Sequence, residues 1–188
     1  MMWIPCCSRL RRCEWLEWRC DTLSCGNDGS IWEKMAVEIP AEILAAIPHR
    51  PPMLLVDEIV ARGENRIHCR RTFRPDEYFV QGHYPGMPIV PGVILIEAGM
   101  QAGAIFLSQL VSGKEGVPVA ARINDVKFKR LVRPGDTIDI EAELTDRLAD
   151  AFFLTVKIQV AGKLATRFDC SVTLAALPAE ESKPGTGS

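Results

Sequence analysis

Two side chains in one short stretch of the chain have the chemistry needed to move protons. His83 lies in a loop stiffened by proline and glycine, and Glu97 follows fourteen positions later inside a long apolar run. A carboxyl group in apolar surroundings is costly unless it is paired, protonated or used in chemistry. A histidine and a carboxyl group within reach of each other can take and return protons next to a carbonyl group. The pair therefore indicates a catalytic acid–base site.

The apolar run between these residues predicts a helix that begins at Pro91 and Gly92 and ends near Val111. The N–H group of Gly92 lies in the first turn and lacks an acceptor within the helix. No side chain at this position blocks a ligand, and the helix N-terminus favours negative charge. Gly92 is therefore a candidate to hold the oxygen of a thioester enolate, although the same pair of residues is also a good helix start.

One further polar side chain shares the face of this helix that carries the carboxylate. Gln101 follows Glu97 by four positions, which is the spacing of neighbours on a helix surface. The positions around them are apolar or small, so we expect residues 94–98 to be fully buried. The polar stripe indicates that the helix meets something other than plain core here, and Gln101 is a candidate substrate-binding residue.

The rest of the chain predicts strands that must cover this helix. Apolar side chains alternate with polar ones in several segments, and Arg133 to Asp136 have turn chemistry. A short helix is expected at residues 41–46, and strands are expected at residues 54–60, 67–73, 119–128, 138–144, 152–160 and 164–174.

A helix that is apolar on nearly every face must be covered on nearly every face. An antiparallel sheet of five or six strands that curves around it, with a second subunit on the open side, achieves this. The sequence thus predicts an α+β protein with a hot-dog fold, in which the sheet wraps around one long central helix. Small residues would let the backbone or a substrate approach the helix closely, and these are Ala98, Gly99, Ala102 and Gly103.

The composition fits one globular domain with a substantial core. The chain has 188 residues, of which 47% are hydrophobic and 24% are charged, and its net charge of −2 gives no basic field for nucleic acid. Residues 89–111 are apolar enough to suggest a membrane span. They contain Pro91, Glu97 and Gln101, however, so we expect a helix buried in a soluble core and no membrane span.

The first 34 residues differ from the rest, because they hold all four tryptophans and five of the seven cysteines. No two of these cysteines have a two-residue spacer, which disfavours a zinc site. Acidic residues disfavour a transit peptide, and no apolar core marks a secretory signal. We expect residues 1–34 to be a disordered or non-native extension with Met35 as the start, residues 35–177 to form the domain, and residues 178–188 to be a disordered tail. The two remaining cysteines, Cys69 and Cys170, fit the reducing cytoplasm.

From about residue 47 to residue 177 the chain resembles the FabZ-type 3-hydroxyacyl-[acyl-carrier-protein] dehydratases. Four stretches carry the resemblance: Pro48-His49-Arg50 with Leu54-Leu55-Val56-Asp57; Gly82-His83-Tyr84-Pro85-Gly86; Pro88-Ile89-Val90-Pro91-Gly92-Val93 with Glu97-Ala98 and Gln101; and Lys127-Phe128-Lys129-Arg130 with Val132, Pro134, Gly135 and Asp136. The chain departs from the family pattern at Met87, where a second histidine is common, and at Pro51, where an aromatic residue is common. Both departures could alter chain-length preference.

The resemblance implies a dimer in which His83 of one subunit and Glu97 of the other form each active site, with three dimers in a hexamer. It implies removal of water from (3R)-hydroxyacyl groups on acyl carrier protein in fatty-acid biosynthesis. His83 would take the α-proton, Glu97 would protonate the leaving hydroxyl, Gly92 N–H would hold the thioester oxygen and the Ile89 carbonyl would orient His83. No metal and no organic cofactor would be needed.

Three other functions remain as alternatives. A hot-dog thioesterase would keep the helix without this histidine loop, and an (R)-specific enoyl-CoA hydratase would place an aspartate shortly before its histidine. A non-catalytic acyl-thioester-binding protein would lose the acid or the base. Related dehydratase-isomerases usually carry aspartate at the position of Glu97, so isomerisation is less expected here.

A basic segment follows the predicted 119–128 strand. Acyl carrier proteins are acidic, so this segment is a candidate docking surface for the carrier, although cations also protect ordinary sheet edges. Its residues are Lys127, Lys129, Arg130 and Arg133, with Arg122 nearby.

Overall fold

A computed structural model describes residues 38–113 and 116–175. The elements in chain order are α1 (Ala41–Ala46), β1 (Glu58–Arg62), β2 (Arg66–Thr72), α2 (Tyr78–Gln81), α3 (Gly92–Leu110), β3 (Val117–Phe128), β4 (Thr137–Leu148), β5 (Ala151–Val160) and β6 (Lys163–Ala175). The predicted extension at residues 1–34, the proposed start at Met35 and the tail at residues 178–188 lie outside the described residues.

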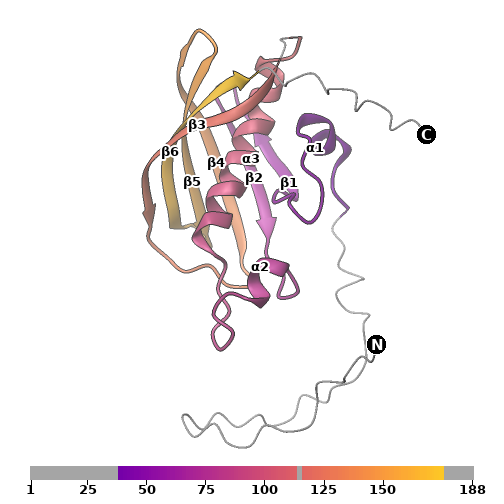
Figure 1. Cartoon of the computed structure of the whole chain (residues 1–188), viewed down its shortest axis with the longest axis vertical. Helices are drawn as coiled ribbons and strands as arrows, with labels where there is room; N and C mark the ends of the chain where they lie inside the picture. The colour runs from indigo at the N-terminus through magenta and orange to yellow at the C-terminus, as the bar shows by residue number, and fades with distance from the viewer. Residues whose placement is uncertain (1–37, 114–115, 176–188) are drawn as a thin grey trace, which may run out of the picture. The chain divides into compact units, whose positions relative to one another are not determined.

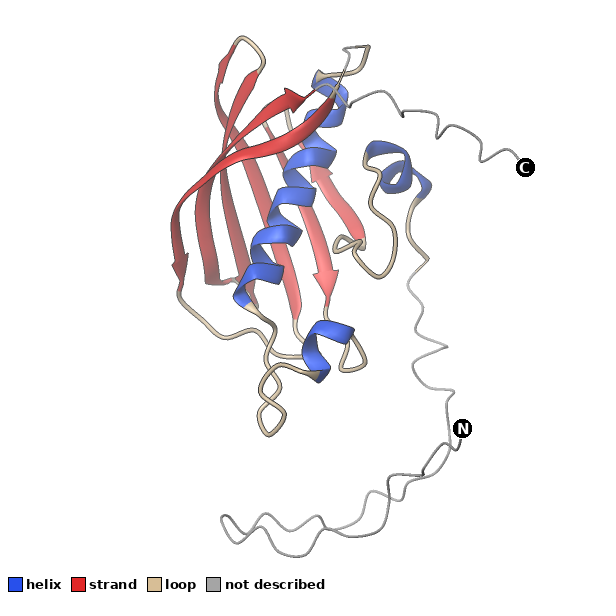
Figure 2. Ribbon diagram, viewed as in Figure 1, coloured by secondary structure: helices blue, strands red, loops and turns tan. Residues whose placement is uncertain are grey.

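The six strands form one antiparallel sheet in the order β1-β2-β4-β5-β6-β3. The chain leaves β2 through α2 and α3 and then enters β3 at the far edge of the sheet. Figures 1 and 2 show α3 lying along one face of the curved sheet. This confirms the predicted hot-dog architecture, in which an antiparallel sheet wraps around one long apolar helix.

Alternation along the strands produces the layer between α3 and the sheet. On β5 the side chains of Phe152, Leu154, Val156 and Ile158 are buried, and the positions between them are more open. Gly99 allows the helix to come close to this layer, because a Cβ there would lie 2.7 Å from Val156 Cγ1 and 2.8 Å from Phe168 Cζ. The lack of a side chain at Gly99 therefore makes room for the sheet and not for a substrate.

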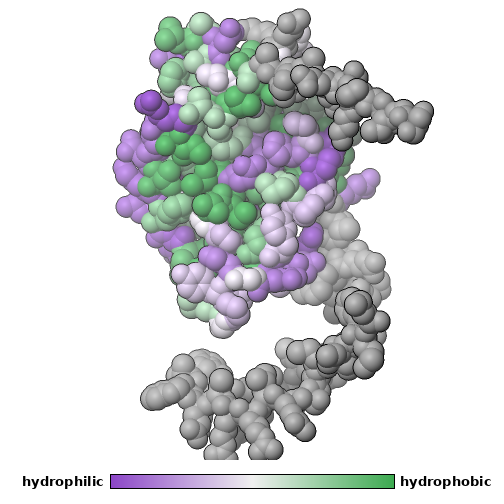
Figure 3. Space-filling model, viewed as in Figure 1, coloured by the Kyte–Doolittle hydropathy of each residue, from purple (hydrophilic) through white to green (hydrophobic). Residues whose placement is uncertain are grey.

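Among the described residues, the other side of α3 is only partly covered. Val93 is 68% exposed and the Glu97 side chain is 33% exposed. Ile94 and Ile96 are only partly buried, so the expectation that residues 94–98 are fully buried is wrong for the chain alone. Figure 3 shows hydrophobic side chains gathered on the face along which α3 lies. α3 is long and apolar enough to span a membrane by composition alone, but it is the core helix of this sheet.

Two local predictions differ from the structure. Residues 54–57 were expected to begin a strand, yet β1 begins only at Glu58. Leu54, Leu55 and Val56 are buried, but the N–H group of Leu55 binds the side chain of Gln101 instead of a neighbouring strand. The segment before His83 was expected to be a loop and contains the short helix α2.

Candidate active site

The loop after α2 fixes His83 at both its backbone and its ring. Its N–H group donates to the Val80 carbonyl at 3.1 Å, and its Nδ1 lies 3.1 Å from the Ile89 carbonyl oxygen. Because a carbonyl oxygen can only accept, Nδ1 carries a proton, and in the neutral ring Nε2 then carries the lone pair. Tyr84 adopts a left-handed φ of 53°, and its ring meets the imidazole edge-on at 4.7 Å. The ring of His83 is thus held so that Nε2 is the nitrogen left free of the Ile89 carbonyl.

His83 lines an apolar pocket of about 290 Å³ at the N-terminal end of α3. The other lining residues are Ile89, Val90, Gly92, Val93, Leu95, Phe128, Arg130, Leu131 and Val132. A larger hollow of about 570 Å³ includes polar residues of β3, β5 and β6 such as Arg122, Thr155 and Asp169. That hollow contains neither His83 nor Glu97, so the smaller pocket is the better candidate for an acyl chain.

Gly92 begins α3, so its N–H group has no acceptor within the helix. The sequence alone suggested open space beside the Cα of Gly92. In the structure this space is filled. A Cβ at Gly92 would lie 2.7 Å from Phe128 Cε1 and 2.8 Å from Cζ. The glycine therefore lets the Phe128 ring pack against the start of the helix and close one side of the pocket.

Glu97 has two polar neighbours within its own chain. Gln101 Nε2 donates to Glu97 Oε1 at 2.7 Å, and His49 Nε2 lies 3.6 Å from the same oxygen. The sequence did not predict the approach of His49 to Glu97, because nothing local links the two positions. His68, on β2, lies away from this pair, and its Nε2 is 3.0 Å from Asp139 Oδ1 on the neighbouring strand β4.

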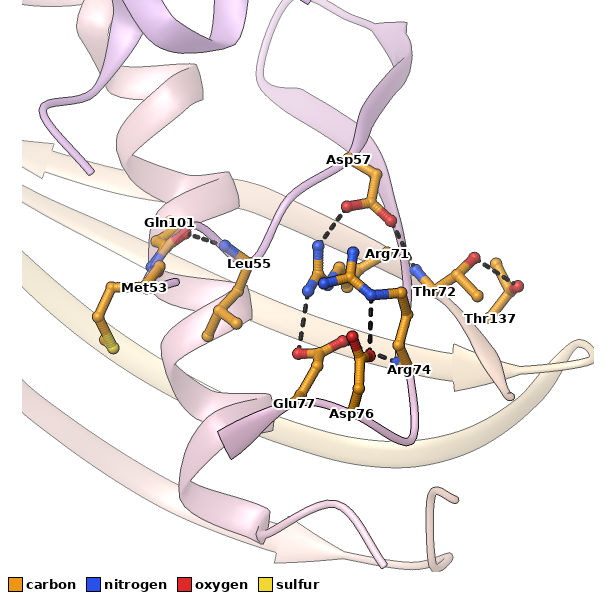
Figure 4. A network of polar contacts seen from close by, with 10 residues as sticks. All are labelled: Met53, Leu55, Asp57, Arg71, Thr72, Arg74, Asp76, Glu77, Gln101 and Thr137. Carbon is orange, nitrogen blue, oxygen red and sulfur yellow. Dashed lines mark hydrogen bonds and ion pairs between the residues drawn. The ribbon is translucent and has the colours of Figure 1, made fainter. Parts of the chain in front are cut away.

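Gln101 connects Glu97 to the segment before β1. It is 1% exposed, and its Nε2 donates both to Glu97 and to the Met53 carbonyl, the latter at 2.8 Å. Its Oε1 accepts from the Leu55 N–H group at 2.8 Å (Figure 4). Both N–H groups of the Gln101 amide are thus used within the chain, where the side chain holds Glu97, and its substrate-binding role stays a prediction.

The structure keeps the two candidate catalytic groups apart within one chain. Glu97 does not line the pocket of His83, and the described residues contain no contact between the two side chains. Within residues 38–113 and 116–175, no three His, Cys, Asp or Glu side chains gather as a metal site would require.

The basic segment lies at the surface beside the pocket. Lys127, Lys129, Arg130 and Arg133 are exposed, and Arg130 lines the pocket. Among the described residues none of these four cations forms an ion pair, whereas Arg70 on the outer face of the sheet binds Asp139 at 3.1 Å. The cluster is available to a partner of opposite charge.

Residues 47–168 match the family model of the FabA-like domain. The 3-hydroxyacyl-[acyl-carrier-protein] dehydratase FabZ of Oenococcus oeni is 43% identical over 111 residues, which cover 58% of this chain and 78% of that protein. FabZ of Syntrophobacter fumaroxidans is 34% identical over 141 residues, which cover 74% of this chain and 96% of that protein.

Solved structures agree on the fold. The dehydratase heterocomplex ApeI:P from Xenorhabdus doucetiae superposes with a TM-score of 0.62 at 18% identity, over 71% of this chain and 90% of that chain. The E. coli PaaI protein gives a TM-score of 0.52 at 17% identity, over 62% and 81%. At these identities the likeness shows the hot-dog fold alone. The family match and the sequence identities show more: the chain belongs to the FabZ-type 3-hydroxyacyl-[acyl-carrier-protein] dehydratases.

Proposed function

We propose that this protein removes water from (3R)-3-hydroxyacyl-[acyl-carrier-protein] and forms the trans-2-enoyl thioester in fatty-acid biosynthesis. One observation carries the proposal. His83 presents Nε2 as a base, because Nδ1 is held by the Ile89 carbonyl, and it does so in an apolar pocket at the N-terminus of α3. The family membership supplies the substrate class.

The reaction follows from the placement of the groups. His83 Nε2 takes a proton from the carbon next to the thioester carbonyl, and that electron pair forms the double bond to the third carbon. The bond from the third carbon to its hydroxyl oxygen breaks, and the Glu97 carboxyl group gives this oxygen a proton, so that water leaves. The Gly92 N–H group holds the thioester oxygen while it gains negative charge, and a donor of this kind contributes about 3 kcal/mol to transition-state stabilisation.

Each active site is proposed to combine His83 of one subunit with Glu97 of another. This is supported by the separation of the two residues within one chain and by the partly covered side of α3. The edge strand β3 also exposes apolar side chains, including Ile123 and Phe128, that a second copy would cover. Three such dimers would give a hexamer. The domain at residues 35–177 and a cytoplasmic location complete the proposal.

An assay of purified protein with 3-hydroxyacyl carrier-protein substrates of several chain lengths tests the reaction. Formation of the enoyl thioester supports the proposal, and release of the free carrier thiol would instead support a thioesterase. His83→Ala and Glu97→Gln should each lower turnover by at least ~100-fold. His68→Ala is the matched control, because His68 pairs with Asp139 away from the pocket, and it should keep the normal rate.

Mixing the two inactive variants tests the shared site. A heterodimer of His83→Ala and Glu97→Gln subunits contains one site in which both residues are native. Subunit exchange should therefore restore part of the activity. Exchange without any gain in activity would contradict the shared site.

A further inference from the structure

Three buried charged side chains meet beside the segment that leads to His83. Asp57, Arg71 and Glu77 are each 7% exposed. Arg71 Nη1 binds Asp57 Oδ1, and its Nη2 lies 3.0 Å from Glu77 Oε2 (Figure 4). One guanidinium group thus joins two carboxylates that lie on either side of it.

Backbone groups bind the remaining carboxylate oxygens. The Thr72 N–H group donates to Asp57 Oδ2 at 2.8 Å, and the Arg74 N–H group donates to Glu77 Oε1 at 2.7 Å. Burying three charges is expensive, and loss of one partner leaves another charge uncompensated. A triad of apolar side chains would cover the same space at lower cost, so these contacts call for a reason beyond packing.

Backbone hydrogen bonds connect the buried triad of Asp57, Arg71 and Glu77 to His83. Glu77 precedes α2, and its carbonyl accepts from the N–H groups of Val80 at 2.9 Å and Gln81 at 3.3 Å. The Val80 carbonyl then accepts from the His83 N–H group at 3.1 Å. Holding Glu77 in place therefore holds the first turn of α2, and α2 holds the backbone of His83.

Asp57, at the opposite end of the triad, is also held by hydrogen bonds of the backbone. The N–H group of Asp57 binds the Arg70 carbonyl at 2.9 Å, and Leu55, two residues earlier, is bound by Gln101 of α3. The Arg71 guanidinium also lies over the Phe73 ring, 5.9 Å from its centroid, and Phe73 meets Phe79 of α2 edge-on at 6.0 Å. The triad thus ties α2 to β2 and to the segment that is anchored on α3.

We propose that Asp57, Arg71 and Glu77 are positioning residues that set the location of the His83 imidazole. The inference rests on the proposed role of His83 as the base. None of the three lines the pocket, so they act through α2 and not on the substrate. Small displacements of a catalytic group can cost about 100-fold in rate, which makes such a support consequential.

Substitutions at Glu77 test this, because they leave the pair of Arg71 and Asp57 intact. Glu77→Ala should lower kcat about tenfold or more while KM stays within about threefold, since the pocket itself is unchanged. Glu77→Gln keeps an acceptor oxygen and should fall between the wild type and Glu77→Ala. Asp76→Ala is the matched control: among the described residues the Asp76 side chain pairs only with Arg74, at 3.1 Å on the surface, and alanine keeps the carbonyl that accepts from Gln81, so kcat should be unchanged.

A second readout follows the ring itself without any turnover. In ¹⁵N NMR spectra of labelled histidine, the wild type and Asp76→Ala should show His83 with the proton on Nδ1. Glu77→Ala should shift or broaden these signals toward a mixture of tautomers, and Glu77→Gln should do so to a smaller extent. All variants are measured well below their unfolding temperatures.

Unchanged kcat and unchanged His83 signals in folded Glu77→Ala would overturn the proposal. So would a fall in kcat that only follows the folded fraction. If Glu77→Ala does not fold, Glu77→Gln decides, and wild-type behaviour in both readouts refutes the positioning role. A wild type with no dehydratase activity would refute the proposed function, while the NMR comparison would still test the positioning of His83.

Discussion

Oε1 of Glu97 accepts a hydrogen bond from Nε2 of Gln101 at 2.7 Å, one helical turn further along α3. The same amide group binds the Met53 carbonyl and the Leu55 N–H group, so a single side chain connects the carboxylate to the segment before β1. Among the described residues, Gln101 and His49 both approach the carboxylate at Oε1. In the proposed mechanism, Oε2 would therefore be the oxygen that gives a proton to the substrate.

Removal of the Gln101 side chain should affect both stability and catalysis. Gln101→Ala leaves the buried Leu55 N–H group and the part-buried Met53 carbonyl without their partner, and we expect a loss of about 2 kcal/mol or more in the free energy of unfolding. Turnover should fall because Glu97 loses its support. Urea denaturation and initial rates measure the two effects.

Ser108→Ala is the control for Gln101→Ala. Ser108 lies on the same stripe of α3, but its hydroxyl donates only to the Ile105 carbonyl of the helix itself. It should keep normal turnover and nearly normal stability. A folded Gln101→Ala protein with the kcat of the wild type would show that Glu97 needs no such support.

The sequence predicted the elements with the clearest periodicity. The long apolar helix, the alternating strands β4, β5 and β6 and the neighbouring positions of Glu97 and Gln101 all follow from local spacing. Residues 54–57 were predicted wrongly, because a short apolar run shows burial without showing which groups satisfy the backbone. The side chain of Gln101 does so here, from 46 positions away.

Contacts between distant segments could not be predicted from one sequence. The approach of His49 to Glu97 depends on how α1 and the following loop pack on α3. The triad did leave one signal, since Arg71 occupies an inward position in the alternating series Ile67, Cys69, Arg71 and Phe73. A cation in an apolar series indicates a buried partner, but only the fold identifies Asp57 and Glu77.

Two glycines of α3 should respond in opposite ways to alanine. Gly99→Ala places a methyl group 2.7 Å from Val156 and 2.8 Å from Phe168, both buried, so α3 must shift and stability should fall by about 1–3 kcal/mol. At Gly103 the nearest atom, Leu154 Cδ1, would be 3.7 Å away, which is ordinary contact. Gly103→Ala should be neutral or stabilising, since alanine favours the helix. Thermal unfolding compares them, and equal losses would contradict the close packing at Gly99.

The buried thiols should make the fold sensitive to alkali. Burial raises the pKa of Cys69 from 9.0 to about 12, and burial together with nearby Asp169 raises the pKa of Cys170 to about 11. Below pH 9 the folded and the unfolded chain both keep the thiol protons, so the full stability of the fold is present. Above pH 9 the unfolded chain loses them first, and stability falls as the pH rises toward 11 and 12.

A variant without both thiols measures this contribution. The double variant Cys69→Ala, Cys170→Ala should lose less stability than the wild type between pH 9 and pH 11. All other titratable groups are the same in the two proteins. The melting temperature against pH gives the slope for each protein. Equal slopes of melting temperature against pH would show that the two thiols do not cause the loss of stability at alkaline pH.

The unpaired basic cluster beside the pocket should steer the carrier protein. Lys129→Glu with Arg130→Glu is expected to raise the KM for carrier-bound substrate, because an acidic carrier would then meet negative charge at the pocket rim. The rate with a short, uncharged thioester mimic should change little, since the mimic makes no use of the rim. Rising salt should bring the wild type toward the variant, as screened long-range attraction is lost.

Arg147→Glu is the control for charge reversal as such. Arg147 is exposed at the end of β4 that pairs with the start of β5, where it lies over Phe152, and it is not part of the pocket. Its reversal should leave the KM for the carrier-bound substrate unchanged. If the variant of Lys129 and Arg130 lost rate equally on both substrates, the change would reflect damage to the pocket that Arg130 lines, and the docking surface would have to lie elsewhere.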